Sequence, residues 1–162
     1  MGVDAREFRA AMARWATGVT IVTSRAGERI HGMTVSDFAG VSLDPPLVLV
    51  CADKSTHTHA RIAEGGCFAA NFLAAGQEAL ADRFASRELE WQRFDALECT
   101  EAVTGAPLVP GALASLDCKV VATHEAGDHV IYVGRVEAVV HGEGGPLLYY
   151  EGAYRALADP AS

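Results

Sequence analysis

The stretch ALASLDCKVVATHEAGDHVIYVGRVEAVV, residues 112–140, predicts two long antiparallel strands joined by a tight turn. Gly127 and Asp128 supply the turn, because Gly adopts positive φ readily and Asp can hydrogen-bond its own backbone. The apolar run 130–133 then predicts a buried strand. His129 therefore lies where the turn enters a strand, and by itself it is either a surface histidine or a residue placed to contact a ligand.

Further strands are predicted on the N-terminal side of this hairpin and at the end of the chain. The run LVLVCA, residues 47–52, is continuously apolar, so we expect it to be buried on both faces. Gly32 and Gly40 interrupt a longer extended stretch, and bulges or close backbone approaches are expected there. The remaining predicted strands are VTIVTS (19–24), IHGMTVSDFAGVSL (30–43) and CFAANFLA (67–74), and PLLYYEGAYRAL (146–157) is either a strand pair or a strand followed by coil.

Three helices are predicted between or before these strands. The first spans Asp4–Trp15 with Asp4 as N-cap, and its apolar residues recur with helical spacing. The second begins with Ser55 as N-cap and ends at Gly65-Gly66. The third covers Gln77–Phe94, with Leu80, Phe84 and Trp91 on one side. About seven strands in consecutive hairpins, with short helices between them, favour an antiparallel barrel.

Composition indicates a single globular domain over residues 1–162, with its core at about 8–157. Half of the residues are apolar, 21% are charged and the formal net charge is −8. This balance argues against nucleic-acid binding, although a local basic pocket for one small anion is compatible with it. No apolar segment is long enough to cross a membrane, and no signal peptide is visible. The four cysteines are expected to be reduced thiols in a cytoplasmic protein.

Two short segments carry polar groups at places where a ligand could bind. In CADKSTHT, residues 51–58, a strand leads into a helix whose N-terminal N–H groups, with Lys54, favour a phosphate. Simple capping by Ser55 explains the same residues. In GMTVSDF, residues 32–38, the backbone beside Thr34, Ser36 and Asp37 could face a flat ligand, or the segment could be a strand with a solvated face.

The histidines give no recognisable metal-binding spacing. His57 and His59 are two residues apart on the predicted helix and so face different directions, while His31, His124 and His141 are isolated. We expect no metal site, and no GxSxG or HExxH motif is present. The aromatic residues of YYEGAYR, residues 149–155, belong either to the core or to a pocket for a planar ring.

Taken in order, these segments resemble the short-chain NAD(P)H:flavin oxidoreductase family, the reductase components of two-component flavin monooxygenases. The resemblance covers about 8–157. The segments that carry it are FRAAMARWATGVTIVT, GMTVSDFAGVSLDPPLVLVCADKSTHT, FAANFL, GAPLVPGALASLDCKV, GDHVIYVGRV and PLLYY…YR. It implies a mainly β fold, an antiparallel Greek-key split β-barrel with short flanking helices, and a homodimer that binds flavin near the subunit interface.

The resemblance also implies a set of binding residues. The flavin ring and ribityl chain would contact Thr34, Val35, Ser36 and Asp37. The phosphate would be held by Ala52, Lys54, Ser55 and Thr58, and Asn71 would support the pocket. His129 would position the nicotinamide, with Tyr154 and Arg155 closing that side. The chain departs from the family's pattern at Asp37, at Ala70 and along 94–103.

The chemistry implied is hydride transfer from nicotinamide C4 of NADH or NADPH to N5 of FMN, FAD or riboflavin. Because the cofactors carry out this step, no side-chain nucleophile or metal is required. The reduced flavin would diffuse to a partner monooxygenase. Two alternatives remain open: a reductase that keeps its flavin and reduces another acceptor such as ferric iron, and a flavin-binding carrier or sensor without turnover.

Overall fold

The computed structural model describes residues 2–158; Met1 and residues 159–162 of the expected domain lie outside that part. Its main element is a seven-stranded sheet in the order β3-β2-β6-β7-β8-β5-β4 with antiparallel neighbours throughout. The strands are β2 (Thr20–Ala26), β3 (Arg29–Val35), β4 (Phe38–Ser42), β5 (Leu47–Asp53), β6 (Cys67–Phe72), β7 (Ala114–Ala126) and β8 (His129–His141). The mainly β, antiparallel fold is therefore confirmed.

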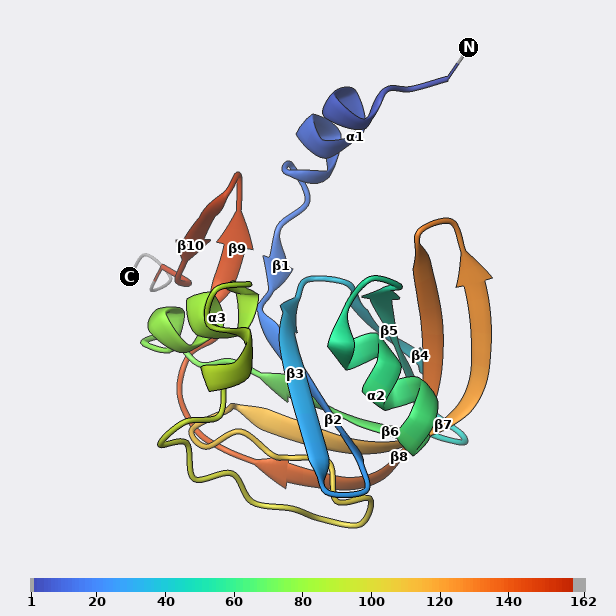
Figure 1. Cartoon of the computed structure of the whole chain (residues 1–162). Helices are drawn as coiled ribbons and strands as arrows, with labels where there is room; N and C mark the ends of the chain where they lie inside the picture. The colour runs from blue at the N-terminus through green and yellow to red at the C-terminus, as the bar shows by residue number, and fades with distance from the viewer. Residues whose placement is uncertain (1, 159–162) are drawn as a thin grey trace.

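The sheet curls so that strands far apart in its order share one core. Val22 of β2, Val50 of β5 and Phe68 of β6 pack in the same buried cluster. Ile62 of helix α2 (His57–Gly65) joins them, because α2 lies across the open side of the curled sheet (Figure 1). This closure by a helix is the split-barrel arrangement that the resemblance implies.

The predicted hairpin of residues 112–140 is present as β7 and β8, with Gly127 at φ 62° in the turn. Its register shifts twice, between Asp117 and Cys118 and between Val120 and Ala122. Such irregularities increase strand twist and bend. The long hairpin curves around the barrel as a result (Figure 1), and it delivers His129 to the edge of the site described below.

A smaller sheet joins the two ends of the described chain. It consists of β1 (Thr17–Gly18), β9 (Leu148–Tyr150) and β10 (Ala153–Arg155) in the order β1-β9-β10. Helix α1 (Ala5–Met12) precedes it and projects away from the barrel (Figure 1). Asp4 caps α1 as predicted, since its Oδ1 accepts from Glu7 N at 2.8 Å.

The third predicted helix is shorter than expected. Helix α3 (Glu78–Ala85) ends at Ser86, whose ψ of 128° is extended, and a short 3₁₀ helix, η1 (Glu90–Gln92), follows. The prediction of one helix over 77–94 was wrong, and so was the placement of Trp91 with Phe84, because Trp91 is 72% exposed. Residues 86–93, called the strap below, instead cross one side of the barrel.

Two smaller predictions also needed correction. The N-cap of α2 is Thr56 rather than Ser55, because Thr56 Oγ1 accepts from His59 N at 3.1 Å. The run 47–52 is not buried on both faces: burial alternates along β5, with Val50 fully buried and its neighbours partly exposed. A close approach at Gly32 is confirmed, since a Cβ there would lie 2.9 Å from Phe84 Cε1 of α3.

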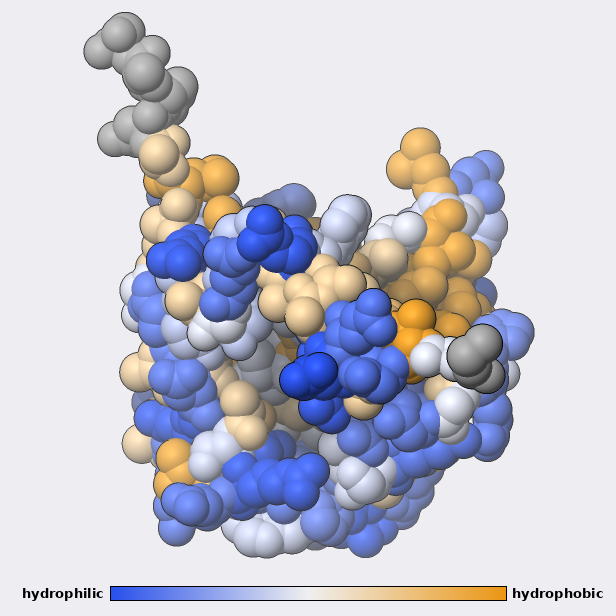
Figure 2. Space-filling view, turned by 90° about the horizontal axis from the view of Figure 1, so that it is seen from above, coloured by the Kyte–Doolittle hydropathy of each residue, from blue (hydrophilic) through white to orange (hydrophobic). Residues whose placement is uncertain are grey.

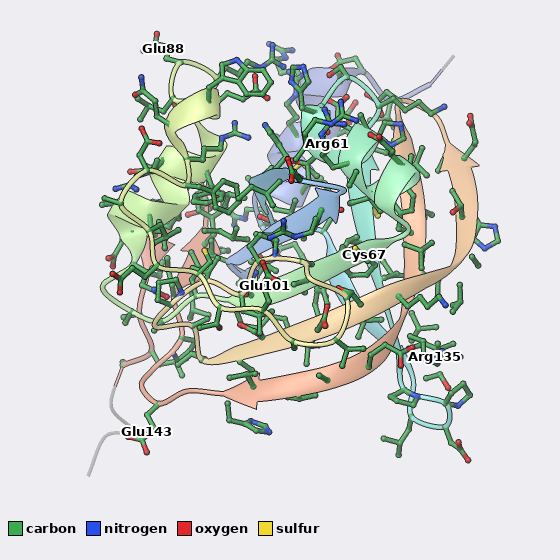
Figure 3. The ribbon with its side chains drawn as sticks, turned by 60° about the horizontal axis from the view of Figure 1, so that its bottom comes forward. Arg61, Cys67, Glu88, Glu101, Arg135 and Glu143 are labelled. Atoms are coloured by element: carbon green, nitrogen blue, oxygen red, sulfur yellow. The ribbon has the colours of Figure 1, made fainter. Side chains whose placement is uncertain are left out.

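Residues 98–111 form a loop that covers the outside of the sheet. It carries Glu101, which pairs with Arg25, and it packs Ala106 and Leu108 against Cys67 (Figure 3). All four cysteines lie in the described part of the chain and are free thiols, as predicted. None of the helices described there is long and apolar enough to span a membrane.

Candidate functional site

A cavity of about 510 Å³ opens where β3 leads into β4, beside the start of α2 and below the strap. Its volume falls within the range of about 300–1,000 Å³ usual for cofactor and ligand sites. Polar and charged side chains predominate in its wall. The lining residues of this main cavity are Met33, Thr34, Val35, Ser36, Asp37, Cys51, Asp53, Ser55, Thr56, His57, Phe84, Ala85, Arg87, Glu90, Arg93 and His129.

His129 is held in the wall by the pairing of β5 and β8. Asp53, the last residue of β5, lies opposite His129, the first residue of β8. Lys54 N donates to Asp128 O at 3.0 Å just beyond this pair. His129 Nδ1 lies 2.7 Å from Asp128 Oδ1, and this hydrogen bond lowers the pKa of Asp128. The backbone of His129 is therefore held by the pairing of β5 with β8, and its ring is held by Asp128. This suits a residue that positions a ligand.

The start of α2 forms the adjoining part of the wall. The carboxylate of Asp53 accepts hydrogen bonds from Ser55 N at 2.8 Å and Ser55 Oγ at 2.7 Å, and these bonds lower the pKa of Asp53. Thr56 caps α2 and so holds the first turn of this helix in a fixed orientation beside the cavity. A helix N-terminus offers N–H donors and a positive dipole end, which together favour a bound anion.

The segment between β3 and β4 lines the opposite part of the cavity. Thr34 Oγ1 donates to Ala81 O of α3 at 2.6 Å, so this hydroxyl holds α3 in place. Asp37 O accepts from Cys51 N at 3.2 Å, which fixes the segment against β5. Burial raises the pKa of the Cys51 thiol, so it remains protonated at neutral pH. Residues 34–37 thus present a fixed backbone and a short polar edge to the cavity.

The strap forms the remaining wall and brings in two arginines. Arg93 is buried, and its guanidinium donates to Gly32 O of β3 at 2.7 Å and to Ser86 O at 2.9 Å. The bond to Gly32 fastens the strap to the barrel, and the bond to Ser86 joins the two ends of the strap. Arg87 is exposed on the strap and lines the cavity, where its charge can meet an anionic ligand.

His57 and Glu90 meet across the gap between α2 and the strap. His57 Nδ1 lies 2.9 Å from Glu90 Oε1, and this hydrogen bond lowers the pKa of Glu90. His31 of β3 lies behind them and is buried. Burial and the nearby Arg93 charge lower the pKa of His31 to about 4, so its ring is neutral at pH 7. His59 faces the other way, with its Nδ1 2.8 Å from Tyr132 Oη, as predicted.

The cavity brings together half of the residues predicted for the site and leaves the other half outside its lining. Those inside are Thr34, Val35, Ser36, Asp37, Ser55 and His129. Those that the lining does not include, although all lie in the described part of the chain, are Ala52, Lys54, Thr58, Asn71, Tyr154 and Arg155.

Three of the residues outside the lining are fully buried. Ala52 packs in the barrel core. Thr58 Oγ1 lies 2.7 Å from His31 Nδ1. Asn71 joins three elements: its Nδ2 donates to Ile21 O, and its Oδ1 accepts from Val109 N and Ser115 Oγ, all within 2.9 Å. These side chains support the fold around the cavity rather than its surface.

The other three residues lie nearer the surface. Lys54 Nζ forms an ion pair with Glu125 Oε2 at 2.7 Å. Tyr154 Oη donates to Asp82 Oδ1 of α3 at 2.7 Å, so Tyr154 braces the helix that lines the cavity. Arg155 is exposed at the end of β10. Sequence reasoning missed Arg87, Glu90 and Arg93 as lining residues. They follow a helix end at Ser86 that no Gly or Pro in the sequence indicates.

A second hollow of about 560 Å³ adjoins the main cavity. Ser36, Asp37 and Cys51 line both of them. The second hollow is mainly apolar and lies beneath the α1 end of the chain. Its other lining residues are Arg9, Met12, Ala13, Trp15, Thr17, Phe38, Ala39, Leu49, Tyr149 and Gly152.

The donor set of the main cavity suits a long ligand with a flat polar ring at one end and an anion at the other. A fixed backbone edge at 34–37 could hydrogen-bond a ring, and the α2 N-terminus with Arg87 could hold a phosphate. His129 lines the same cavity and lies opposite Asp53 in the pairing of β5 with β8. The residues present therefore fit a flavin nucleotide.

Comparisons with known proteins point in the same direction. The model of the flavin reductase like domain matches residues 12–158. The chain is 42% identical over 153 residues to FMN reductase (NADH) SmoA of Agrobacterium fabrum, covering 94% of this chain and 86% of that protein. It is 41% identical to the reductase component of 4-hydroxyphenylacetate 3-monooxygenase of Thermus thermophilus, with 95% and 97% coverage. Among solved structures, the NADH:FAD oxidoreductase SgcE6 of Streptomyces globisporus superposes with a TM-score of 0.90 at 36% identity and 99% coverage of both chains.

Proposed function

The chain belongs to the flavin reductase like domain family, and from this premise we propose how its main cavity brings NADH and a flavin together. The protein is an oxidoreductase that reduces flavin with NADH and supplies reduced flavin to a partner monooxygenase. When both are bound, nicotinamide C4 supplies the hydride and flavin N5 receives it. The protein must hold the two rings in contact, with nicotinamide C4 next to flavin N5.

The segment 34–37 binds the flavin ring and the ribityl chain. Its backbone is fixed by the bonds of Thr34 to Ala81 and of Cys51 to Asp37. Donors that are fixed before the reaction can stabilise the negative charge that develops on the N1–C2=O edge without reorganising. Val35 and Ser36 complete this edge.

The flavin phosphate lies at the start of α2. Ser55 and Thr56 line the cavity there, and Arg87 faces the same space from the strap. Lys54 adds a positive charge nearby, although it is paired with Glu125. Ala52, Thr58 and Asn71 act indirectly, because their buried side chains set the position of β5, α2 and β6.

His129 positions the nicotinamide. Its ring is tethered to Asp128 and partly exposed at the cavity wall, so it can contact a second ring placed over the flavin. Tyr154 contributes by bracing α3 through Asp82, and Arg155, exposed at the end of β10, would meet the pyrophosphate of the dinucleotide. No proton transfer by a side chain is needed for the hydride step.

The observation that carries this proposal is the meeting of residues 34–37, the α2 N-terminus and His129 in one cavity. The test is the loss of NADH absorbance on adding FMN, FAD or riboflavin in excess, repeated with NADPH. Turnover of free flavin supports the proposal, and the same assay ranks the flavins. No NADH oxidation with any flavin would leave only a carrier or sensor. Turnover that needs ferric iron or a dye with tightly held flavin would identify a flavin-retaining reductase instead.

We also infer that the protein is a homodimer with the second copy covering the α1 end. Helix α1 buries none of its own side chains, and Phe8 and Trp15 are 60% and 69% exposed. Hydrophobic and hydrophilic residues lie side by side on this face of the molecule (Figure 2). Exposed apolar patches of this kind mark interaction surfaces. Because the apolar hollow beneath α1 shares residues with the main cavity, the partner would lie next to the flavin.

Sedimentation or light scattering in solution tests the dimer. We expect twice the chain mass for the wild type and a shift towards monomer for the pair Phe8→Glu and Trp15→Glu, with Val121→Glu on the outer face of β7 as control. A monomeric wild type would overturn this proposal.

We further propose that residues 1–162 form one domain and that the protein is cytoplasmic. The four free thiols support the cytoplasmic location.

A further inference from the structure

Three potential metal ligands from three different elements meet at the rim of the main cavity. They are His31 of β3, His57 at the start of α2 and Glu90 of η1 in the strap. In Figure 3, Arg61 marks α2 and Glu88 marks the strap, the two elements that the group joins across the barrel opening. None of the three residues is needed for the flavin and nicotinamide contacts proposed above.

The distances between the ligand atoms suit a small divalent cation. His31 Nε2 lies 3.3 Å from Glu90 Oε1, and His57 Nδ1 lies 2.9 Å from the same oxygen. All three ligand atoms are within 4.8 Å of one another. Zinc bonds to imidazole nitrogen and carboxylate oxygen are about 2.0–2.2 Å long, so tetrahedral ligands are separated by about 3.4 Å. The two separations to Glu90 Oε1, 3.3 and 2.9 Å, lie slightly below this value.

His31 provides the second, independent observation. The residue is only 3% exposed, yet its Nε2 has no hydrogen-bond partner among residues 2–158. The proximity of this atom to Glu90 is therefore not itself a hydrogen bond. A buried polar atom without a partner is costly and requires an explanation. A metal ion between His31, His57 and Glu90 would supply the missing partner.

The opposite nitrogen of His31 has the environment expected behind a metal ligand. Its Nδ1 lies 2.7 Å from Thr58 Oγ1, which is also fully buried. Ligating histidines commonly place their other ring nitrogen in such a hydrogen bond, which fixes the ring orientation. Trp91 packs against both imidazoles, with centroids 5.7 Å from His31 and 4.8 Å from His57.

Positive charge nearby limits the affinity but does not prevent binding. Arg93 and Arg61 both act on His31 electrostatically. Arg93 is already bonded to two carbonyl oxygens, and Arg61 is paired with Glu64 at 2.7 Å. Glu90 supplies the negative charge of the site itself. A set of two imidazoles and one carboxylate is a common ligand set of Zn²⁺ with one position open.

We propose that His31, His57 and Glu90 bind a zinc-type divalent cation that fastens the strap to α2 and β3. Because His57 and Glu90 also line the main cavity, the open coordination position faces the space where ligands enter. The bound ion would thus fix the side of the cavity that side-chain contacts alone hold in place. This inference does not depend on the proposed flavin chemistry, since metal binding can be measured without flavin or NADH.

The test is titration of chelator-treated protein with Co²⁺ and Zn²⁺ in the absence of flavin. We expect one Co²⁺ per chain with the visible absorption of a four-coordinate site, and displacement by Zn²⁺. No sulfur-to-cobalt charge-transfer band should appear, because the ligand set contains no thiolate. Such a band would place the ion on a cysteine and overturn the assignment.

Matched variants locate the site. Glu90→Gln and His57→Ala should each weaken Zn²⁺ binding by at least about 10-fold, since loss of even an outer-shell group costs that much. Glu88→Gln, on the same strap but exposed, and His124→Ala, on exposed β7, should bind as the wild type does. Circular dichroism checks that each variant is folded. Equal affinity in Glu90→Gln and Glu88→Gln, or no binding to the wild type beyond that of His57→Ala, would overturn the proposal.

Discussion

The two sides of the main cavity are held by different kinds of interaction. On one side, Asp53 and His129 are placed by a continuous backbone ladder between β5 and β8. On the other side, the strap of residues 86–93 is held to the rest of the molecule by side chains, chiefly Arg93 to Gly32 and Glu90 to His57, and Arg93 also bonds Ser86 within the strap. The ladder side therefore resists single substitutions, whereas the strap depends on a few side chains that one substitution can remove.

The largest effect is expected from Arg93→Ala. The substitution removes two charge-assisted hydrogen bonds from a buried guanidinium, each worth roughly 1.5–3 kcal/mol, and it leaves a cavity. We expect the free energy of unfolding to fall by about 3–5 kcal/mol, measured by urea denaturation. Arg83→Ala, which removes an exposed bond to Asp95 O, should cost less than about 1 kcal/mol. Similar losses for both variants would show that the strap is not fastened by Arg93.

The same contrast explains how much of the molecule could be predicted from its sequence. The ladder side could be predicted because apolar strands and the Gly127-Asp128 turn are local signals, and they place His129 directly. The strap could not, because helical spacing continues through Ser86 to Phe94 and nothing local ends the helix. Its path is set by Arg93 and Glu90 binding partners about thirty or more residues away.

The α2 start shows the same limit on a smaller scale. Ser55 and Thr56 are adjacent, and either could cap a helix. Asp53 accepts hydrogen bonds from both the N–H and the hydroxyl of Ser55, so Thr56 rather than Ser55 is the N-cap of α2. The resemblance to flavin reductases gave the correct family, while the phosphate contacts it implies for Ala52 and Thr58 and the supporting role it implies for Asn71 stay predictions; all three residues are buried and lie outside the cavity lining.

The second prediction concerns the ladder side and is catalytic. His129→Ala should lower kcat/KM for NADH by about 10–100-fold, equivalent to about 1.4–2.7 kcal/mol, because the nicotinamide loses its positioning contact. Flavin affinity, measured by fluorescence quenching, should change little. The fold should also persist, since the β5–β8 ladder is made by backbone groups. Unchanged NADH kinetics in this variant would show that His129 does not position the nicotinamide.

The third prediction concerns the strap and separates phosphate from ring binding. Arg87→Ala should weaken FMN binding by about 10-fold, or about 1.4 kcal/mol, through loss of a charge-assisted bond to the phosphate. Riboflavin, which has no phosphate, should bind the variant and the wild type equally. Arg29→Ala, which removes an exposed pair with Glu64 outside the cavity lining, serves as the charge-matched control. An equal loss for FMN and riboflavin would place Arg87 near the ring instead.

The smallest effect tests the α2 start, where the ladder side ends. Thr56→Ala removes the N-cap and should lower the free energy of unfolding by about 1 kcal/mol. Ser55→Ala should cost less stability, because Ser55 bonds Asp53 rather than the helix, but it should weaken FMN binding relative to riboflavin if Ser55 contacts the phosphate. Since the two residues are neighbours, their variants separate capping from binding at one place in the chain. The reverse pattern, with Ser55→Ala less stable than Thr56→Ala, would show that Ser55 is the N-cap of α2. The ladder side would then depend on single side chains as much as the strap does.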